Sequence, residues 1–198
     1  MKSIGIVIFF CFSMLVFGED KIDESLLLFR ERCSACHLDS GHGLKALNVA
    51  SIAGLPRWYV TQQVRHFRDG IRGSHPEDKH GKLMRDLAQN LDDRSLAFLG
   101  KYVQNLEPLK ERKTIAEGEA PKGKALYEKN CLDCHGEEAI GNRKAMAPPL
   151  NVQVDWYLVR QMENFSKGIR NHAEAAKIES GDMNDVVAYL STLKKPQK

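Results

Sequence analysis

The sequence lacks three features that would place it in large classes of proteins. After residue 18, no apolar stretch reaches the roughly 18 residues that a membrane-spanning helix needs, so we expect the rest of the chain to be soluble. There is no run of basic residues, the aromatic residues do not alternate with lysine and arginine, and the formal net charge is only +3, which argues against a nucleic-acid partner. No alternation of apolar and polar residues predicts strands. What remains is a helical protein of nearly balanced charge.

The chain begins with a segment typical of exported proteins. Met1-Lys2-Ser3 gives a short positive region, residues 4–17 are apolar, and Val16-Phe17-Gly18 offers modest side chains before a cleavage site at Glu19. An uncleaved membrane anchor is the alternative, but this apolar run is shorter than a spanning helix needs. We therefore expect residues 1–18 to be a cleaved signal peptide.

Cysteine is scarce, and the four cysteines beyond the signal peptide form two pairs. In an oxidising compartment four cysteines would usually indicate two disulfides. Here each pair is followed by a histidine, in Cys33-Ser-Ala-Cys36-His37 and in Cys131-Leu-Asp-Cys134-His135. This is the attachment motif of a c-type haem, in which two thiols add to the vinyl groups and the histidine is the proximal iron ligand. The motifs predict two covalently bound haems c, attached through Cys33, Cys36, Cys131 and Cys134, with His37 and His135 as proximal ligands.

Three other interpretations of the cysteines explain less of the pattern. A four-cysteine zinc site would leave the histidine after each pair accidental. A thioredoxin-like dithiol requires a βαβ context, and the sequence gives no sign of strands. Simple disulfides would leave the paired spacing unexplained.

The two motifs belong to an internal repeat. A shift of 98 positions aligns Cys33 with Cys131 and residues 58–72 with residues 156–170. Within each of these segments, apolar residues recur at helical spacing, which predicts an amphipathic helix closed by Gly70 in the first half and by Gly168 in the second. The predicted apolar stripes are Val60, Val64, Phe67 and Ile71, and Leu158, Met162, Phe165 and Ile169.

Further helices are expected on either side of these segments. A shift of 87 positions aligns a final helix in each half, with plausible starts at Asp92-Asp93 and at residues 180–182. Short helices are expected before the motifs, over residues 26–32 and 123–129. The charged segment 105–122, which contains Pro108, Gly118 and Pro121, is interpreted as the linker between the halves.

This organisation resembles a known family. Three helices, an early Cys-x-x-Cys-His motif and a terminal helix with a tyrosine resemble a class I cytochrome c domain, and two such domains behind a signal peptide resemble the dihaem cytochrome c4 family. The pattern Trp-Tyr-x-x-x-Gln-x-x-x-Phe-x-x-Gly-Ile-Arg, present in both halves, is similar to a conserved segment of that family. The resemblance implies an all-α fold of two tandem domains, at residues 19–108 and 119–198, joined by a linker at residues 109–118. It also implies a periplasmic electron carrier that serves respiratory redox proteins, such as a terminal oxidase or a dehydrogenase, with possible docking to a membrane complex.

The resemblance also implies a sixth iron ligand for the first haem. Class I domains usually place a methionine before the last helix, and the stretch from Gly70 to Met84 matches that layout. We expect Met84 to be the ligand, the alternative being a core methionine. His75 and His80 in the same stretch are the fallback ligands.

The second half departs from the family pattern. Its corresponding stretch is 11 residues shorter, and aligning the terminal helices places Met84 opposite Asn171 or His172. We therefore expect His172 to be the sixth ligand of the second iron, the alternative being an exposed histidine. Met162 and Met183 are expected in the core, and Met146 nearer the proximal side. If none of these residues coordinates, the second iron has an open position.

Residues around the haems also follow from the resemblance. Family domains often use a proline carbonyl to accept a hydrogen bond from the proximal histidine. Pro148 or Pro149 can serve His135, whereas the first half has Ala50-Ser51 at that place. Four further residues are candidates for contact with haem propionates, namely Trp58, Arg72, Trp156 and Arg170.

The predicted function is outer-sphere electron transfer. Two alternatives remain open. The protein could be a haem enzyme with an open site at the second haem, or an electron-transfer subunit of a larger redox complex.

Overall fold

The computed structural model describes residues 23–111, 113–115, 117–172 and 178–194. The expected signal peptide, residues 1–18, lies outside the described residues. The fold is all-α, as predicted, and the extended pairing within the described residues is limited to two isolated bridges, Leu44 with Val49 and Asn142 with Ala147. Within the part of the chain that is described, no helix has both the length and the apolar character needed to cross a membrane.

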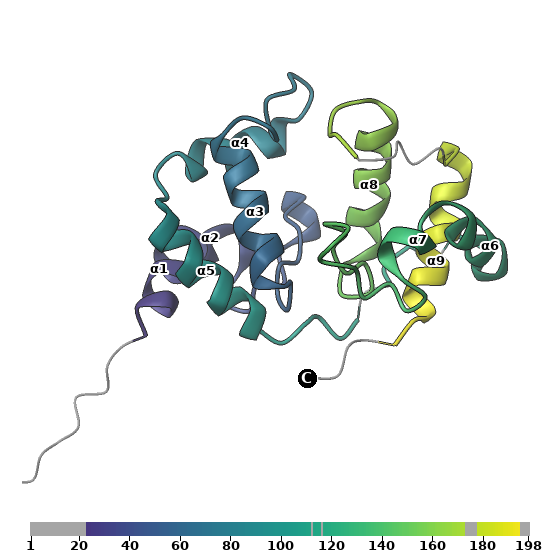
Figure 1. Cartoon of the computed structure of the whole chain (residues 1–198), viewed down its shortest axis with the longest axis horizontal. Helices are drawn as coiled ribbons and strands as arrows, with labels where there is room; N and C mark the ends of the chain where they lie inside the picture. The colour runs from purple at the N-terminus through teal and green to yellow at the C-terminus, as the bar shows by residue number, and fades with distance from the viewer. Residues whose placement is uncertain (1–22, 112, 116, 173–177, 195–198) are drawn as a thin grey trace, which may run out of the picture.

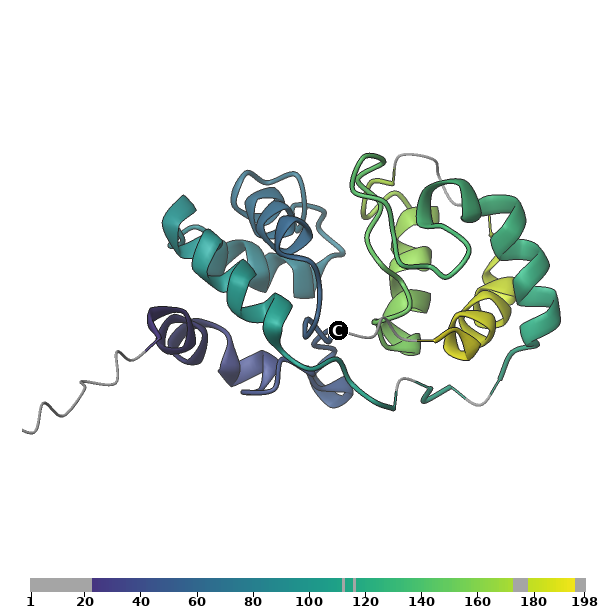
Figure 2. The same cartoon turned by 60° about the horizontal axis from the view of Figure 1, so that its bottom comes forward.

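The helices form two groups that follow one another along the chain (Figure 1). In both views α3 and α8 lie toward the middle of the molecule, and the extended chain between α5 and α6 runs along one side from one group to the other (Figure 2). The first group contains α1 Glu24–Arg32, α2 Ser34–His37, η1 Lys45–Leu47, α3 Arg57–Arg68, α4 Lys79–Ala88 and α5 Asp93–Asn105. The second contains α6 Ala120–Asn130, α7 Leu132–His135, α8 Asp155–Ser166, η2 Ser180–Asp182 and α9 Met183–Thr192.

Local sequence signals account for several helix ends. The Asp92 carboxylate accepts a hydrogen bond from the backbone N–H of Ser95 at 2.8 Å, which confirms the predicted start of α5. Such a cap stabilises a helix by about 1 kcal/mol. After α3 and α8 the chain turns at Gly70 and Gly168, whose φ angles are +73° and +69°. This left-handed conformation is one that glycine adopts without a steric penalty, and the two predicted glycine stops are confirmed.

Each group has its own apolar core, placed where its first and last helices cross. Phe29 on α1 meets Leu99 and Val103 on α5 in the first core, and Tyr127 on α6 meets Val186 and Leu190 on α9 in the second. Met183 and Met162 belong to the second core, as the sequence predicted.

Two expectations about the first half were wrong in detail. Ile71 was placed on the apolar stripe of the middle helix, but α3 ends at Arg68 and Ile71 is 58% exposed, because the chain has already turned at Gly70. The stretch from Gly70 to Met84, for which the sequence predicted no helix, contains most of α4. Asp78 starts this helix by accepting a hydrogen bond from Gly81 N–H at 2.8 Å.

Candidate functional site

The two Cys-x-x-Cys-His motifs fold identically. Each forms a single helical turn, α2 or α7, that starts directly after its first cysteine. The backbone N–H of His37 donates to the carbonyl of Cys33 at 2.9 Å, and that of His135 donates to the carbonyl of Cys131 at 2.9 Å. Because one turn contains both thiols and the histidine, a single flat group can meet all three side chains.

The thiols of these turns lack the lowered pKa that dithiol redox chemistry requires. Burial raises the pKa of Cys33 to about 12 and the pKa of Cys131 to about 11, whereas a reactive dithiol needs a lowered thiol pKa. Within the described part of the chain, the cysteines of the two motifs form no disulfide. Among the described residues, no three His, Cys, Asp or Glu side chains gather in a group that could hold a metal ion.

The histidine of each motif, expected to be the proximal iron ligand, is buried and anchored through one ring nitrogen. His37 Nδ1 lies 3.0 Å from the carbonyl oxygen of Ala50, and His135 Nδ1 lies 2.8 Å from that of Pro148. Burial lowers the pKa of both histidines, so both rings are neutral at neutral pH. In a neutral ring, an Nδ1–H that donates to a carbonyl leaves the Nε2 lone pair to coordinate iron. The predicted bond from His135 is confirmed for Pro148, and Ala50 takes the same role without a proline.

His172 lies opposite His135. The two ring centres are 6.4 Å apart, with an angle of 19° between the ring planes. Two imidazoles that bound one metal ion from opposite sides would have ring centres about 6.2 Å apart, because each metal–nitrogen bond is about 2.0 Å and each nitrogen lies about 1.1 Å from its ring centre. Phe165 packs against His172 with ring centres 4.6 Å apart, and this contact restrains the position of the His172 ring. The separation of the two rings is compatible with an iron between them, but His172 is exposed, and its role as a ligand stays a prediction.

The first half places its candidate sixth ligand on a helix. Met84 lies in α4 and is half-buried. Of the fallback ligands, His80 is exposed, and His75 Nδ1 accepts a hydrogen bond from Glu77 N–H at 3.2 Å. The role of Met84 stays a prediction.

The repeated segments that were predicted to lie near haem propionates meet between the two halves. Arg72 donates to Tyr157 OH at 2.8 Å, and Arg170 donates to Tyr59 OH at 3.2 Å, so each arginine reaches across to the tyrosine of the other half. Arg72 Nε is buried and has no hydrogen-bond partner among the described residues. We call this set the arginine network; its members are Tyr59, Gln63, Arg72, Tyr157, Gln161 and Arg170.

The arginine network has the composition of an anion site. Two guanidinium groups converge there, and none of its six members is a carboxylate. Burial raises the pKa of Tyr157, but the charges of Arg72 and Arg170 outweigh it and leave this pKa lowered. A buried positive charge normally has an anionic partner, and the charge of Asp78 acts on Arg170 from outside the network. Further carboxylates, such as haem propionates, would suit the two guanidinium groups. Trp58 and Trp156, the other two candidates, are half-buried beside Tyr59 and Tyr157.

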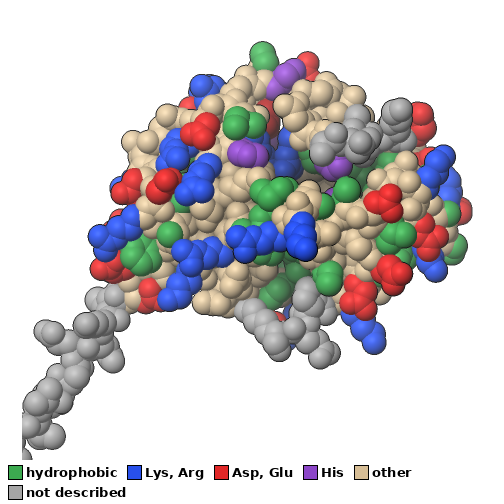
Figure 3. Space-filling model, in the orientation of Figure 1, with side chains coloured by type: hydrophobic (Ala, Val, Ile, Leu, Met, Phe, Trp, Pro, Cys, Tyr) green, Lys and Arg blue, Asp and Glu red, His purple; other side chains and the backbone are tan. Residues whose placement is uncertain are grey.

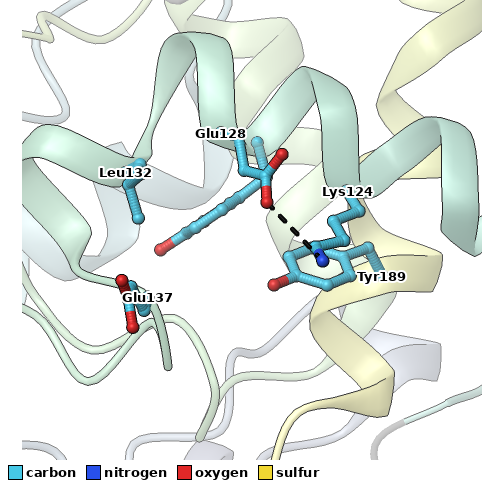
Figure 4. A pocket seen from close by; sticks show the side chains of 6 residues that line it. Lys124, Glu128, Leu132, Glu137 and Tyr189 are labelled. Carbon is cyan, nitrogen blue, oxygen red and sulfur yellow. Dashed lines mark ion pairs between the residues drawn. The ribbon is translucent and has the colours of Figure 1, made fainter.

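A pocket lies behind the second attachment turn. It has a volume of about 350 Å³, and Figure 4 shows the ion pair between Lys124 and Glu128 at its rim, with a separation of 3.7 Å. Tyr127 donates from its hydroxyl to the carbonyl of Gly136 at 2.6 Å, which ties α6 to the end of α7. The pocket lining consists of Lys124, Tyr127, Glu128, Leu132, Glu137 and Tyr189.

Sequence reasoning missed the residues that hold the linker. The buried Asp155 accepts hydrogen bonds from the backbone N–H groups of Thr114 and Ile115 and, at 2.7 Å, from the Thr114 hydroxyl. On the other half, Lys45 Nζ donates to the Thr114 hydroxyl at 3.3 Å. The position of Asp155 at the start of a predicted helix was the available signal, since such a residue usually binds backbone N–H groups.

Two tandem helical domains, each with a Cys-x-x-Cys-His turn and an anchored histidine, define the class of c-type cytochromes with more than one domain. A family model described as cytochrome c matches residues 120–194. The chain is 27% identical to cytochrome c4 of Azotobacter vinelandii, over 81% of this chain and 84% of that protein. It is 30% identical to the thiosulfate dehydrogenase electron acceptor of Thiomonas intermedia, over 80% of this chain and 77% of that protein.

A solved structure agrees with these relatives. The cytochrome c4 structure from Acidithiobacillus ferrooxidans superposes with a TM-score of 0.70 at 28% identity, covering 82% of this chain and 99% of that one. The chain belongs to the cytochrome c family and is a dihaem cytochrome of the cytochrome c4 type. Membership implies covalently bound haem c and a role in electron transfer with redox partners.

Proposed function

We propose that this protein is a periplasmic carrier that holds two haems c and passes electrons between respiratory proteins, towards a terminal oxidase or reductase. The observation that carries the proposal is the repeated proximal geometry, in which His37 and His135 are both buried and anchored through Nδ1. The apolar segment at residues 4–17 supports export. The likeness to a protein named as the electron acceptor of a dehydrogenase supports redox protein partners.

We assign the residues of each site as follows. Haem c supplies a one-electron couple between ferric and ferrous iron, so no bond in a substrate changes. The thiols of each pair fix the group to its turn, and each anchored histidine keeps its ring orientation in both oxidation states. The assigned attachment residues are Cys33, Cys36, Cys131 and Cys134, and the assigned iron ligands are His37 with Met84 and His135 with His172.

Unequal ligands imply unequal potentials. Ligation by histidine and methionine favours the ferrous state, whereas a second histidine lowers the potential. We therefore infer that an electron on the protein resides mainly on the first haem, and that the second haem is the stronger reductant.

Haem content provides the decisive experiment. The denatured protein is expected to retain haem stain on a gel and to show a mass increased by two haems. Cys131→Ala with Cys134→Ala should leave one haem, because each domain has its own attachment turn. Recovery of an intact chain without haem and with bound zinc would contradict the proposal.

The alternative is an enzyme or a complex subunit with an open second iron. The position of His172 opposite His135 favours the carrier, because an axial histidine would occupy that place. Purified protein that turns over a substrate without a redox partner would favour the enzyme instead.

A further inference from the structure

The two proximal histidines are anchored by segments that differ in their support. We call residues 48–51 the first proximal loop and residues 146–149 the second proximal loop. Each begins at a residue with positive φ, Asn48 at +54° or Met146 at +55°, and its next residue belongs to an isolated bridge. The two loops correspond under the shift of 98 positions, so Ala50 and Pro148 are equivalent hydrogen-bond acceptors.

The second proximal loop is held within its own domain. Pro148 and Pro149 fix two successive φ angles, which limits the motion of the carbonyl that accepts from His135. Just after the loop, Asn151 Nδ2 donates to the carbonyls of Glu138 at 2.9 Å and of Lys194 at 3.0 Å. Both of these supports for the His135 anchor come from its own domain.

The first proximal loop has none of these devices in its sequence. Ala50 and Ser51 stand where the second loop has prolines, and Ala53 stands where the second half has Asn151. Alanine and serine leave φ free, and alanine has no side-chain donor. The backbone of the first domain still holds the chain beside this loop, because Ile52 N–H donates to the carbonyl of Gly41 at 2.8 Å. Side-chain support that keeps the Ala50 carbonyl 3.0 Å from His37 Nδ1 must come from elsewhere.

The support comes from the other domain. Gln153 Nε2 donates to the carbonyl of Ser51 at 2.8 Å in a buried hydrogen bond, and its Oε1 accepts from Val154 N–H at 3.0 Å, which orients the amide. Arg160 Nη1 donates to the carbonyl of Asn48 at 3.0 Å, with its guanidinium 5.3 Å from the ring centre of Trp156. These two side chains therefore donate hydrogen bonds to the first proximal loop on either side of Ala50. We call this pair of hydrogen bonds the grip on the loop.

Apolar packing reinforces this grip. Val152, next to Gln153, is 3% exposed and belongs to the apolar core of the first domain together with Leu55. The chain that carries Gln153 is thereby inserted into the first domain, so the amide has little freedom to leave Ser51.

We propose that Gln153 and Arg160 are positioning residues for the proximal histidine of the first haem, acting from the second domain through the first proximal loop. The proposal rests on the proposed attachment of a haem beside His37. A carbonyl that accepts from Nδ1–H makes Nε2 a better electron donor to iron. Loss of the grip lets the Ala50 carbonyl drift, weakens that donation and stabilises the ferrous state of the first haem alone. The contact between the domains thus sets the potential of one haem and leaves the other unaffected.

The test uses the holoprotein with Gln153→Met, which has similar volume and no donor. The potential of the first haem, followed through its methionine-to-iron charge-transfer band, is expected to rise, while that of the second stays unchanged. At a fixed solution potential, the ferrous-to-ferric ratio of the first haem should rise, because weaker donation from Nε2 favours ferrous iron. The proton NMR signals of the methyl groups on the first oxidised haem should also shift, because the ring orientation of His37 changes. Arg160→Met should act in the same direction.

Two further variants separate positioning from general loosening. Ala50→Pro with Ser51→Pro, added to Gln153→Met, copies the second proximal loop and should restore the potential. Val152→Ala weakens the same contact between domains but removes no hydrogen bond to the loop, so it should lower stability and leave both potentials unchanged.

Other outcomes overturn the inference in distinguishable ways. If Gln153→Met retains both haems and changes neither the potential nor the NMR signals of the first, the positioning role is wrong and the carrier function stands. Equal shifts at both haems, or failure of the two prolines to restore the potential, would also reject it. A protein in which no haem is attached at Cys33 and Cys36 would instead reject the proposed function.

Discussion

At the scale of single residues, the turn after each proximal histidine differs between the two halves. Leu38 has φ +63° and ψ +161°, and Gly136 at the equivalent position has φ +76° and ψ +164°. This region is almost restricted to glycine, and a residue with a side chain held there costs about 1–3 kcal/mol. The first attachment turn therefore stores backbone strain that the second avoids.

Replacing Leu38 by glycine is expected to raise the free energy of unfolding by about 1 kcal/mol. The release of strain exceeds the roughly 0.5–1 kcal/mol of extra entropy that glycine gives the unfolded chain. Urea unfolding of the holoprotein measures the change. The reciprocal change, Gly136→Leu, should lower the free energy of unfolding through backbone strain alone. An added Cβ at Gly136 meets no atom within 4 Å, so no steric clash contributes. A neutral effect of both changes would show that the turns are not strained.

The two expected sixth ligands, Met84 and His172, provide a second prediction at this scale. The oxidised protein should show a methionine-to-iron charge-transfer band of single-haem intensity. Met84→Ala should abolish the band and lower the potential of one haem, because histidine–methionine ligation favours the ferrous state. His172→Ala should keep the band and open the second iron to cyanide or carbon monoxide. Two-haem intensity in the unmodified protein would instead point to another methionine, with Met146 the first to examine.

At the scale of elements, each domain depends on the crossing of its first and last helices. In the second domain α6 and α9 touch at Gly123, where an added Cβ would overlap the carbonyl oxygen of Asp185. Lys122 beside it donates to the carboxylates of Asp182 at 2.6 Å and Asp185 at 2.8 Å, and Glu119 N–H donates to Asp185 at 2.7 Å. The close backbone approach and these polar contacts hold α6 against α9. Tyr127 on α6 in turn holds the second attachment turn, through its hydrogen bond to the carbonyl of Gly136.

Gly123→Ala is expected to lower the free energy of unfolding by about 1–3 kcal/mol, because two backbones must separate to admit the methyl group. Chemical unfolding of the holoprotein measures this. Gly181→Ala is the matched control, since a Cβ there meets nothing within 4 Å and the effect should be small. Equal effects of the two changes would mean that helix contact is not the cause.

At the scale of the whole molecule, the domains are joined by side chains far apart in sequence. Hydrogen bonds of the arginine network join the two domains, and so do those from Gln153 and Arg160 to the first proximal loop. Asp155 binds the linker to the second domain. The two sites are therefore connected through side chains, and residues of the second domain lie close to the site of the first domain.

The net charge and its distribution predict how strongly a redox partner is steered to this protein by electrostatics. The formal net charge is +3, and both signs of charge occur over each half on the face shown in Figure 3. Long-range steering should therefore be modest, and the association rate with a redox partner should depend only weakly on ionic strength. Stopped-flow electron transfer at increasing salt measures this. A steep fall in rate would reveal a localised charged docking face.

Local patterns were sufficient for much of this protein. The motifs, the repeat and the helical spacing predicted the all-α fold, the start of α5 at Asp92, the glycine stops and the bond from His135 to Pro148. Each of these depends on residues within about a dozen positions, where chain geometry leaves few choices. The assignments of Met84 and His172 to iron stay predictions.

Contacts between distant residues were decided by the tertiary structure. Nothing near Ser51 indicates that Gln153 would hold it, because their separation of 102 positions is bridged only when the domains dock. The exposure of Ile71 and the helix around Met84 also depend on how the chain packs after Gly70. The sequence by itself determined two attachment turns on two helical domains. Only the tertiary structure decided that the second domain supports the histidine of the first, because such hydrogen bonds exist between surfaces and not along the chain.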